Sequence, residues 1–172
     1  MKSLVTLSAL LLSVAAAQAS AQAPDAGEVK RVMDYYYGAQ SDTPVLVDFK
    51  LCEDVYREGE NKYNCKNEID RDQLQSGASV YAWMNFMVPR NERGDVLLQL
   101  KHDGVIHGAR KAGVEGGLRY RTWRRITLAR PGQWELPILY DNQKTVREID
   151  TVTLTVNDPS LIGLFETPPA TQ

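Results

Sequence analysis

Residues 80–109 read VYAWMNFMVPRNERGDVLLQLKHDGVIHGA, and this stretch decides the fold class. Its start, residues 80–88, is largely apolar on both alternating faces, which is typical of a strand at the centre of a sheet. Asp103-Gly104 is a strong hairpin signal, because these residue types tolerate the positive φ angles of a type I′ turn. The stretch therefore predicts three antiparallel strands, over 80–88, 95–101 and 105–109, with a turn over 89–94.

The same period of two continues on both sides of this stretch. Upstream, alternate residues form one face of a half-buried strand, namely Val45, Val47, Phe49 and Leu51. Downstream, a glycine-rich connection at 113–117 precedes further predicted strands, over 118–128, 133–140 and 146–156. About seven short strands with frequent turn signals are typical of an antiparallel β-sandwich or barrel. No long helices alternate with the strands, which argues against a parallel α/β enzyme fold.

Residues 1–21 have the features of a secretory signal peptide. Lys2 gives a positive start, residues 4–17 are apolar or small, and Ala19 and Ala21 supply a small-x-small cleavage pattern. Cleavage after Ala21 is the first choice and cleavage after Ala19 the second. The mature chain is therefore expected to be periplasmic or secreted.

The remaining chain is expected to form one domain with short flanking segments. Residues 22–41 hold a linker and a helix, because Asp25 and Glu28 resemble a capping box ahead of apolar residues at helical spacing. The helix ends in an aromatic cluster, Tyr35–Tyr37, before Gly38. The β-domain is assigned to 42–157 and a C-terminal tail to 158–172.

Composition narrows the classes of partner. The formal charge is −2 for the full chain, and loss of Lys2 with the signal peptide makes it −3. An acidic chain outside the cytoplasm is not expected to bind nucleic acid. After residues 1–21, no apolar run approaches the ~20 residues that span a bilayer, so no transmembrane segment is expected in the mature protein.

The chain has two cysteines, Cys52 and Cys65. In an oxidising compartment this even pair predicts one disulfide, which would close a loop in the polar stretch 53–72. A redox pair usually has the shorter C-x-x-C spacing, which is absent here. A metal-binding thiol pair is the remaining alternative.

The most unusual local composition lies in the predicted strand 118–128. Arg119, Arg121, Trp123 and Arg125 alternate along it and share one face. Guanidinium groups suit carboxylates and phosphates, and an indole suits sugar rings or cations. The face is thus a candidate site for an envelope protein, an anionic glycan or a lipid headgroup. The same pattern also fits a solvated outer face whose arginine stems cover Trp123, and such faces often only keep a sheet soluble.

The run Arg121-Thr122-Trp123, followed by Pro131-Gly132-Gln133-Trp134, resembles a bacterial immunoglobulin-like β-sandwich family of unknown function. Members carry an R-T-W strand followed by a G-x-W strand, and the resemblance covers residues 80–156. The N-terminal helix and the cysteine segment depart from the family pattern. The resemblance implies an immunoglobulin-like sandwich with an accessory, non-catalytic role, and it brings no catalytic residues. Trp134 is expected to be a core anchor between sheets.

The two histidines, His102 and His107, flank the predicted hairpin turn. With a two-residue turn, His102 pairs with Val105 and Leu100 pairs with His107, which places the imidazoles roughly 5–8 Å apart on one face. Two imidazoles can begin a zinc or copper site, but two ligands are an incomplete set.

Taken together, the residues predict an accessory binding module of the cell envelope, neither an enzyme nor dependent on a cofactor. Two alternatives stay open. One is a metal-binding or metal-dependent envelope protein that uses His102 and His107. The other is a structural subunit of an envelope assembly that docks through the N-terminal helix and Tyr35–Tyr37.

Overall fold

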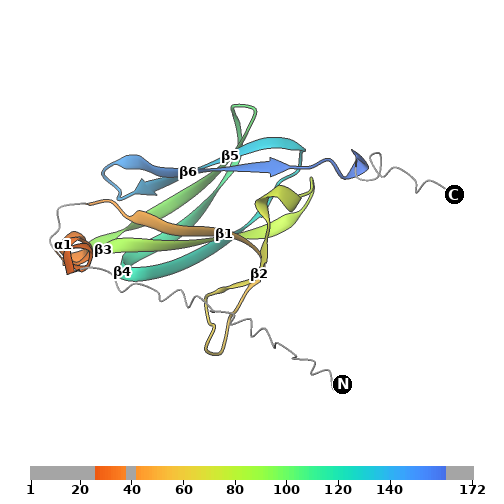
Figure 1. The fold of residues 1–172 in the computed structure, drawn as a ribbon. Coiled ribbons are helices and arrows are strands. Elements are labelled where there is room, and N and C mark those ends of the chain that lie inside the picture. The colour runs from red at the N-terminus through yellow and green to blue at the C-terminus, as the bar shows by residue number, and fades with distance from the viewer. Residues whose placement is uncertain (1–25, 38–41, 162–172) are drawn as a thin grey trace, which may run out of the picture.

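A computed structural model describes residues 26–37 and 42–161 of this protein, and it shows an antiparallel β-protein with one α-helix (Figure 1). The elements are α1 (Ala26–Tyr37), β1 (Val45–Val55), β2 (Cys65–Ile69), η1 (Arg71–Gln73), β3 (Ser79–His102), β4 (Val105–Thr127), β5 (Gly132–Asp141), β6 (Val146–Val156) and η2 (Pro159–Leu161). The predicted all-β class is therefore confirmed. The immunoglobulin-like arrangement of the strands is not confirmed by these pairings and stays a prediction.

The six strands belong to one sheet that is organised by the long hairpin β3–β4. The first half of β3 pairs with β1, its second half pairs with β5, and β4 follows its other edge along most of its length. Strands β2 and β6 extend the sheet beyond β1 and β5, in the order β2-β1-β3-β5-β6. β4 pairs with β3 alone among the described strands, so one edge of β4 is open.

The larger of two apolar clusters among the described residues joins both halves of the sheet. It draws buried side chains from five strands, including Leu51, Phe86, Leu98, Ile126, Leu136 and Leu154. In the first half of β3 both faces are buried over 82–86, as predicted for a central strand, and in its second half buried residues alternate from Gly94 to His102. In β1 the prediction was wrong for Val45 and Val47, which are 42% and 57% exposed. A register shift between Leu46 and Asp48 reverses the faces, so that Leu46 packs against the core instead.

The predicted turn over 89–94 is instead an irregularity inside the continuous strand β3. Val88 pairs with Gly117 and Arg93 with Glu115, so β3 has residues 89–92 where β4 has only Gly116. The predicted glycine connection at 113–117 likewise lies within continuous β4. Extra residues on one strand bend and twist a sheet without ending it. Proline and glycine thus mark a bend here, and the predicted strands on either side merge into two long ones.

Gly94 is required at this bend. A Cβ atom there would lie 2.5 Å from the Asp141 carbonyl oxygen and 2.6 Å from the Tyr140 ring. We expect Gly94→Ala to lower the free energy of unfolding by about 1–3 kcal/mol, because β5 must shift to admit the methyl group. Urea denaturation measures the change. Gly108→Ala is the matched control, since its nearest neighbours would lie 3.9 Å away; equal losses in the two variants would contradict this account.

The predicted N-terminal helix is confirmed as α1, which lies beside β3 (Figure 1). Its apolar side chains Val29, Val32 and Met33 are each more than 40% exposed. Tyr36 is half-buried, and the side chains of Tyr35 and Tyr37 lie outside the described residues. Within the described ranges, none of the helices has the length and hydropathy needed to span a bilayer. The predicted signal peptide and most of the predicted tail lie outside these ranges.

Candidate functional site

The predicted arginines lie on the face of the sheet that points away from the core, which we call the outer face. There, Trp83 of β3 stands opposite Trp123 of β4, and Tyr81 stands opposite Arg125. Trp83 is 5% exposed and forms a second, smaller cluster with Cys52 and Val55 of β1, against which Trp123 packs. The outer face is therefore not simply a solvated surface, because part of it is covered by another segment of the chain.

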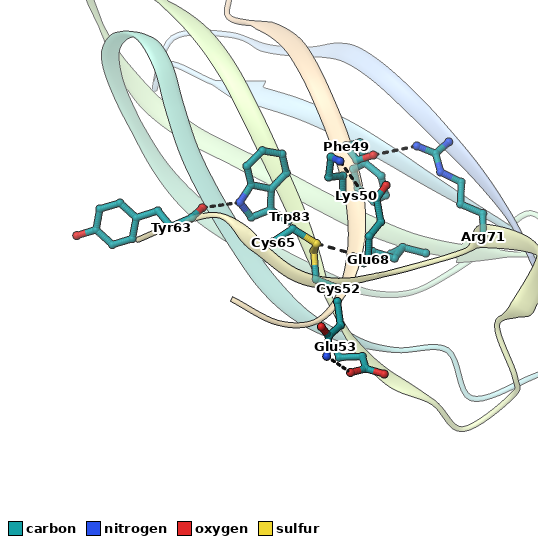
Figure 2. The surroundings of a disulfide bond; sticks show 11 residues. Phe49, Lys50, Cys52, Glu53, Tyr63, Cys65, Glu68, Arg71 and Trp83 are labelled. Carbon is teal, nitrogen blue, oxygen red and sulfur yellow. Dashed lines mark hydrogen bonds and ion pairs between the residues drawn. A yellow bond between two sulfur atoms is a disulfide. The ribbon is translucent and has the colours of Figure 1, made fainter. Parts of the chain in front are cut away.

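The covering segment is the β1–β2 loop, residues 56–64. The predicted disulfide between Cys52 and Cys65 is present and joins the two strands on either side of this loop (Figure 2). The Trp83 indole N–H donates a hydrogen bond to the Tyr63 carbonyl oxygen at 2.7 Å, as Figure 2 also shows. The disulfide and this hydrogen bond together hold the loop over the outer face.

Tyr63 has an unusual backbone conformation, with φ at 70°. This left-handed region is unfavourable for residues other than glycine, asparagine and aspartate. Two hydrogen bonds of its backbone hold it there: its N–H donates to the Tyr56 carbonyl at 2.8 Å, and its carbonyl accepts from Trp83. The result is that the Tyr63 ring is 44% exposed and lies 5.6 Å from the Trp123 ring.

Trp123 is half-buried and its ring is in contact with the loop. Besides Tyr63, the Arg57 guanidinium lies 5.3 Å from the centre of the Trp123 ring and 5.7 Å from that of Tyr81. These cation–π contacts cover part of the Trp123 indole. The Trp123 side chain lies between its own strand, β4, and the loop 56–64.

The predicted arginines differ in their surroundings. Arg119 and Arg125 are exposed, whereas Arg121 is half-buried and its guanidinium donates to the Lys62 carbonyl oxygen at 3.5 Å. None of the three is within 4.0 Å of a carboxylate in the part of the chain that the structure describes. By contrast, Lys111 is paired with Asp95 at 2.7 Å, and that hydrogen bond raises the pKa of Lys111. The arginines therefore carry positive charge that nearby described residues do not neutralise.

A hollow of about 520 Å³ lies where the loop meets the open edge of β4. We call it the arginine hollow; it is lined by Tyr63, Gly113, Arg119, Tyr120, Arg121, Thr122, Trp123 and Arg124. Three of these side chains are guanidinium groups, and no aspartate or glutamate is among them. Its volume falls within the range of small-ligand sites.

The bend in β4 brings residues 110–111 close to residues 124–125. The Arg124 guanidinium donates to the Lys111 carbonyl oxygen, and Arg110 donates to the Arg125 carbonyl oxygen at 3.2 Å. These bonds connect the first half of β4 to its second half across the bend. They also satisfy carbonyl groups that the open strand edge leaves without a ladder partner.

The structure thus brings Arg119, Arg121 and Trp123 together at one site but leaves Arg125 outside the lining of the hollow. Arg124 and Tyr63 are lining residues that the sequence analysis missed. The period of two assigned Arg124 to the core-facing side, but on an open edge strand such a side chain can reach the rim. Nothing local in the sequence connects Tyr63 with β4, and the predicted disulfide was the one available signal.

The two histidines form a separate cluster at the other end of the hairpin. Asp103 and Gly104 both have positive φ, and His102 pairs with Val105, as predicted. The predicted pair of Leu100 with His107 was wrong, because Leu100 pairs with Gly108 across a register shift. The imidazole centres are 5.9 Å apart, within the predicted range.

The surroundings of His102 suit a packing role. It is 7% exposed, its Nε2 lies 2.9 Å from the Pro131 carbonyl oxygen and its Nδ1 lies 3.2 Å from the Asp103 carboxylate. Both rings pack against Trp134, at 4.8 Å for His102 and 5.6 Å for His107. Within the described residues no group of three histidine, cysteine, aspartate or glutamate side chains is placed to hold a metal ion.

Comparison with protein-family models finds no match to this chain, and comparison with curated proteins finds none either. The resemblance to an immunoglobulin-like family therefore stays a prediction from the sequence.

Proposed function

We propose that this protein is an accessory binding module that recognises an anionic partner or ligand in the arginine hollow. The observation that carries the proposal is the lining of the hollow, which has three arginines and no carboxylate. Arginine binds carboxylate and phosphate groups through paired hydrogen bonds, and its charge is not lost at any ordinary pH. The half-buried position of Arg121 adds to the effect, because partial burial weakens screening by salt.

The proposed role is binding without catalysis. A hydroxyl nucleophile is activated by an adjacent general base, most often a histidine or a carboxylate, and the lining has neither. The lining supplies only tyrosine and threonine hydroxyls beside the arginines. The predicted family resemblance, which implies an accessory role, agrees with this proposal.

The proposed compartment is the periplasm or the exterior of the cell. Disulfides persist in oxidising compartments, and Cys52–Cys65 positions one wall of the proposed site. The predicted signal peptide over residues 1–21 supports the same compartment. An anionic component of the envelope is therefore the kind of partner that we propose.

The experiment is an NMR titration of the mature protein with two acidic probes, trigalacturonate and triglutamate. We expect at least one probe to shift the backbone amide signals of Tyr63 and of residues 119–124. Replacing Arg119 and Arg121 together by glutamine should weaken binding by about tenfold or more, since each lost charged hydrogen bond costs roughly 1.5–3 kcal/mol.

The control is Arg130→Gln, which removes one exposed positive charge in the turn after β4. This variant should bind both probes as the wild type does. Equal weakening in the control would show that only net charge matters, and a wild type that shifts with neither probe would contradict the proposal.

A further inference from the structure

Two buried polar atoms without hydrogen-bond partners lie on the strand pair β3–β4, and one of them belongs to Arg121, a lining residue of the arginine hollow. They are the Asn85 side-chain oxygen and the Arg121 Nε–H, and within the described residues no other buried side-chain nitrogen or oxygen atom is left unpaired in this way. Asn85 is only 8% exposed, and it stands directly opposite Arg121 in the β3–β4 register on the outer face. Unpaired polar atoms in buried positions are rare in folded proteins and call for a partner.

The chemistry of these atoms narrows the identity of that partner. Arg121 Nε–H is a donor and the Asn85 oxygen is an acceptor. A hydroxyl group satisfies both, because its oxygen accepts from the arginine while its proton is donated to the amide oxygen. An ionised carboxylate satisfies only the arginine, since it has no proton to donate. A small group that both donates and accepts is therefore the complement of this pair.

The arginine hollow and this pair share Arg121, which lines the hollow through its guanidinium. A ligand placed there would meet the exposed Arg119 guanidinium with an acidic group and the buried pair with a hydroxyl. We infer that the ligand is an acidic saccharide, a sugar ring that carries a carboxylate and neighbouring hydroxyls. This inference rests on the proposed function and gives its ligand a chemical class.

The shape of the site favours a saccharide over a protein partner. The hollow holds about 520 Å³, the size of a small-ligand site, whereas a stable protein interface buries about 800 Å² on each partner. The exposed Tyr63 ring lies at its wall and offers an apolar edge and a hydroxyl to a sugar. Amphipathic rings of this kind contribute contact area with little loss of conformational entropy.

Access to the buried pair requires a movement of the Arg121 side chain. Its hydrogen bond to the Lys62 carbonyl oxygen is 3.5 Å long, at the outer limit for this interaction. Turning the guanidinium toward the hollow therefore gives up a weak contact. The Asn85 oxygen lies outside the lining of the hollow, so a ligand hydroxyl reaches it only after this movement.

The test compares two acidic ligands in the wild type and in Asn85→Leu by titration calorimetry. The ligands are trigalacturonate, which has carboxylates and hydroxyls, and triglutamate, which has carboxylates, peptide amides and an ammonium group but no hydroxyl. In the wild type we expect trigalacturonate to bind about tenfold more tightly, the effect of one or two well-formed hydrogen bonds. In Asn85→Leu this ratio of dissociation constants should fall to about threefold or less.

Each outcome decides between the proposals. A wild type that binds both ligands equally overturns the saccharide inference and leaves anion recognition standing. A ratio that stays near tenfold in a folded Asn85→Leu variant, with its folding checked by thermal melting, overturns the role of Asn85. If neither ligand binds the wild type, the proposed function itself is wrong. The wild-type comparison needs no variant, so the saccharide inference can be overturned even if Asn85→Leu does not fold.

Discussion

Trp134→Ala should lower the free energy of unfolding by about 3–5 kcal/mol, the usual cost of deleting a buried tryptophan side chain. Trp134 is 2% exposed and packs against both histidine rings at the hairpin end. Its indole N–H donates to the Arg130 carbonyl oxygen at 2.9 Å. The substitution therefore leaves a cavity and also removes the partner of that carbonyl. Urea denaturation followed by tryptophan fluorescence and circular dichroism measures the loss.

The matched control is Trp123→Ala, which deletes the same side chain from the outer face. Trp123 is half-buried and packs beside the loop rather than inside the core that joins the strands. The substitution should lower the free energy of unfolding by about 1–2 kcal/mol, because the half-buried Trp123 side chain removes less apolar area from water than Trp134 does. Equal losses in the two variants would contradict the division into an inner core and an outer cluster.

The sequence predicted where strands lie much better than where they end. Alternation located every strand from β3 to β6, because each side chain reports on its own face. Pro89 and the glycines around 116 were interpreted as turns, since these residues usually interrupt strands. Whether the chain reverses or only bends depends on the partner strand, which continues past the interruption here. That information is not local, so periodicity alone did not supply it.

The candidate site was predictable only in part for a related reason. Arg119, Arg121 and Trp123 lie on one strand, so their common face followed from spacing. Tyr63 comes from a distant loop, and Arg124 reaches the hollow because β4 is an edge strand that bends back on itself. Both facts depend on tertiary structure. The unpaired atoms of Asn85 and Arg121 depend on side-chain geometry and have no signature in sequence.

Replacing both cysteines by alanine, Cys52→Ala with Cys65→Ala, should lower the free energy of unfolding by about 2–4 kcal/mol. In the chain-entropy model the disulfide lowers the conformational entropy of the unfolded chain over the twelve residues between the cysteines. Without the disulfide the unfolded state gains that entropy and becomes more favourable relative to the folded state. Alanine is the right replacement because Cys52 is fully buried, and a serine hydroxyl there would need a partner. Urea denaturation of the variant beside the wild type measures the change.

The same variant separates two effects of the disulfide, one on the stability of the whole domain and one on the position of the loop 56–64. Without it, only hydrogen bonds such as Trp83–Tyr63 and Tyr63–Tyr56 would hold the left-handed conformation at Tyr63. We therefore expect the amide protons of residues 56–64 to exchange faster while those of β5 and β6 stay protected, because local opening need not involve the core. The matched control is Lys50→Ala, which breaks the exposed Lys50–Glu68 ion pair between the same two strands and should cost less than about 1 kcal/mol. Uniformly faster exchange across all strands, or an unchanged loop, would contradict the view that Cys52–Cys65 holds Tyr63 at the wall of the arginine hollow.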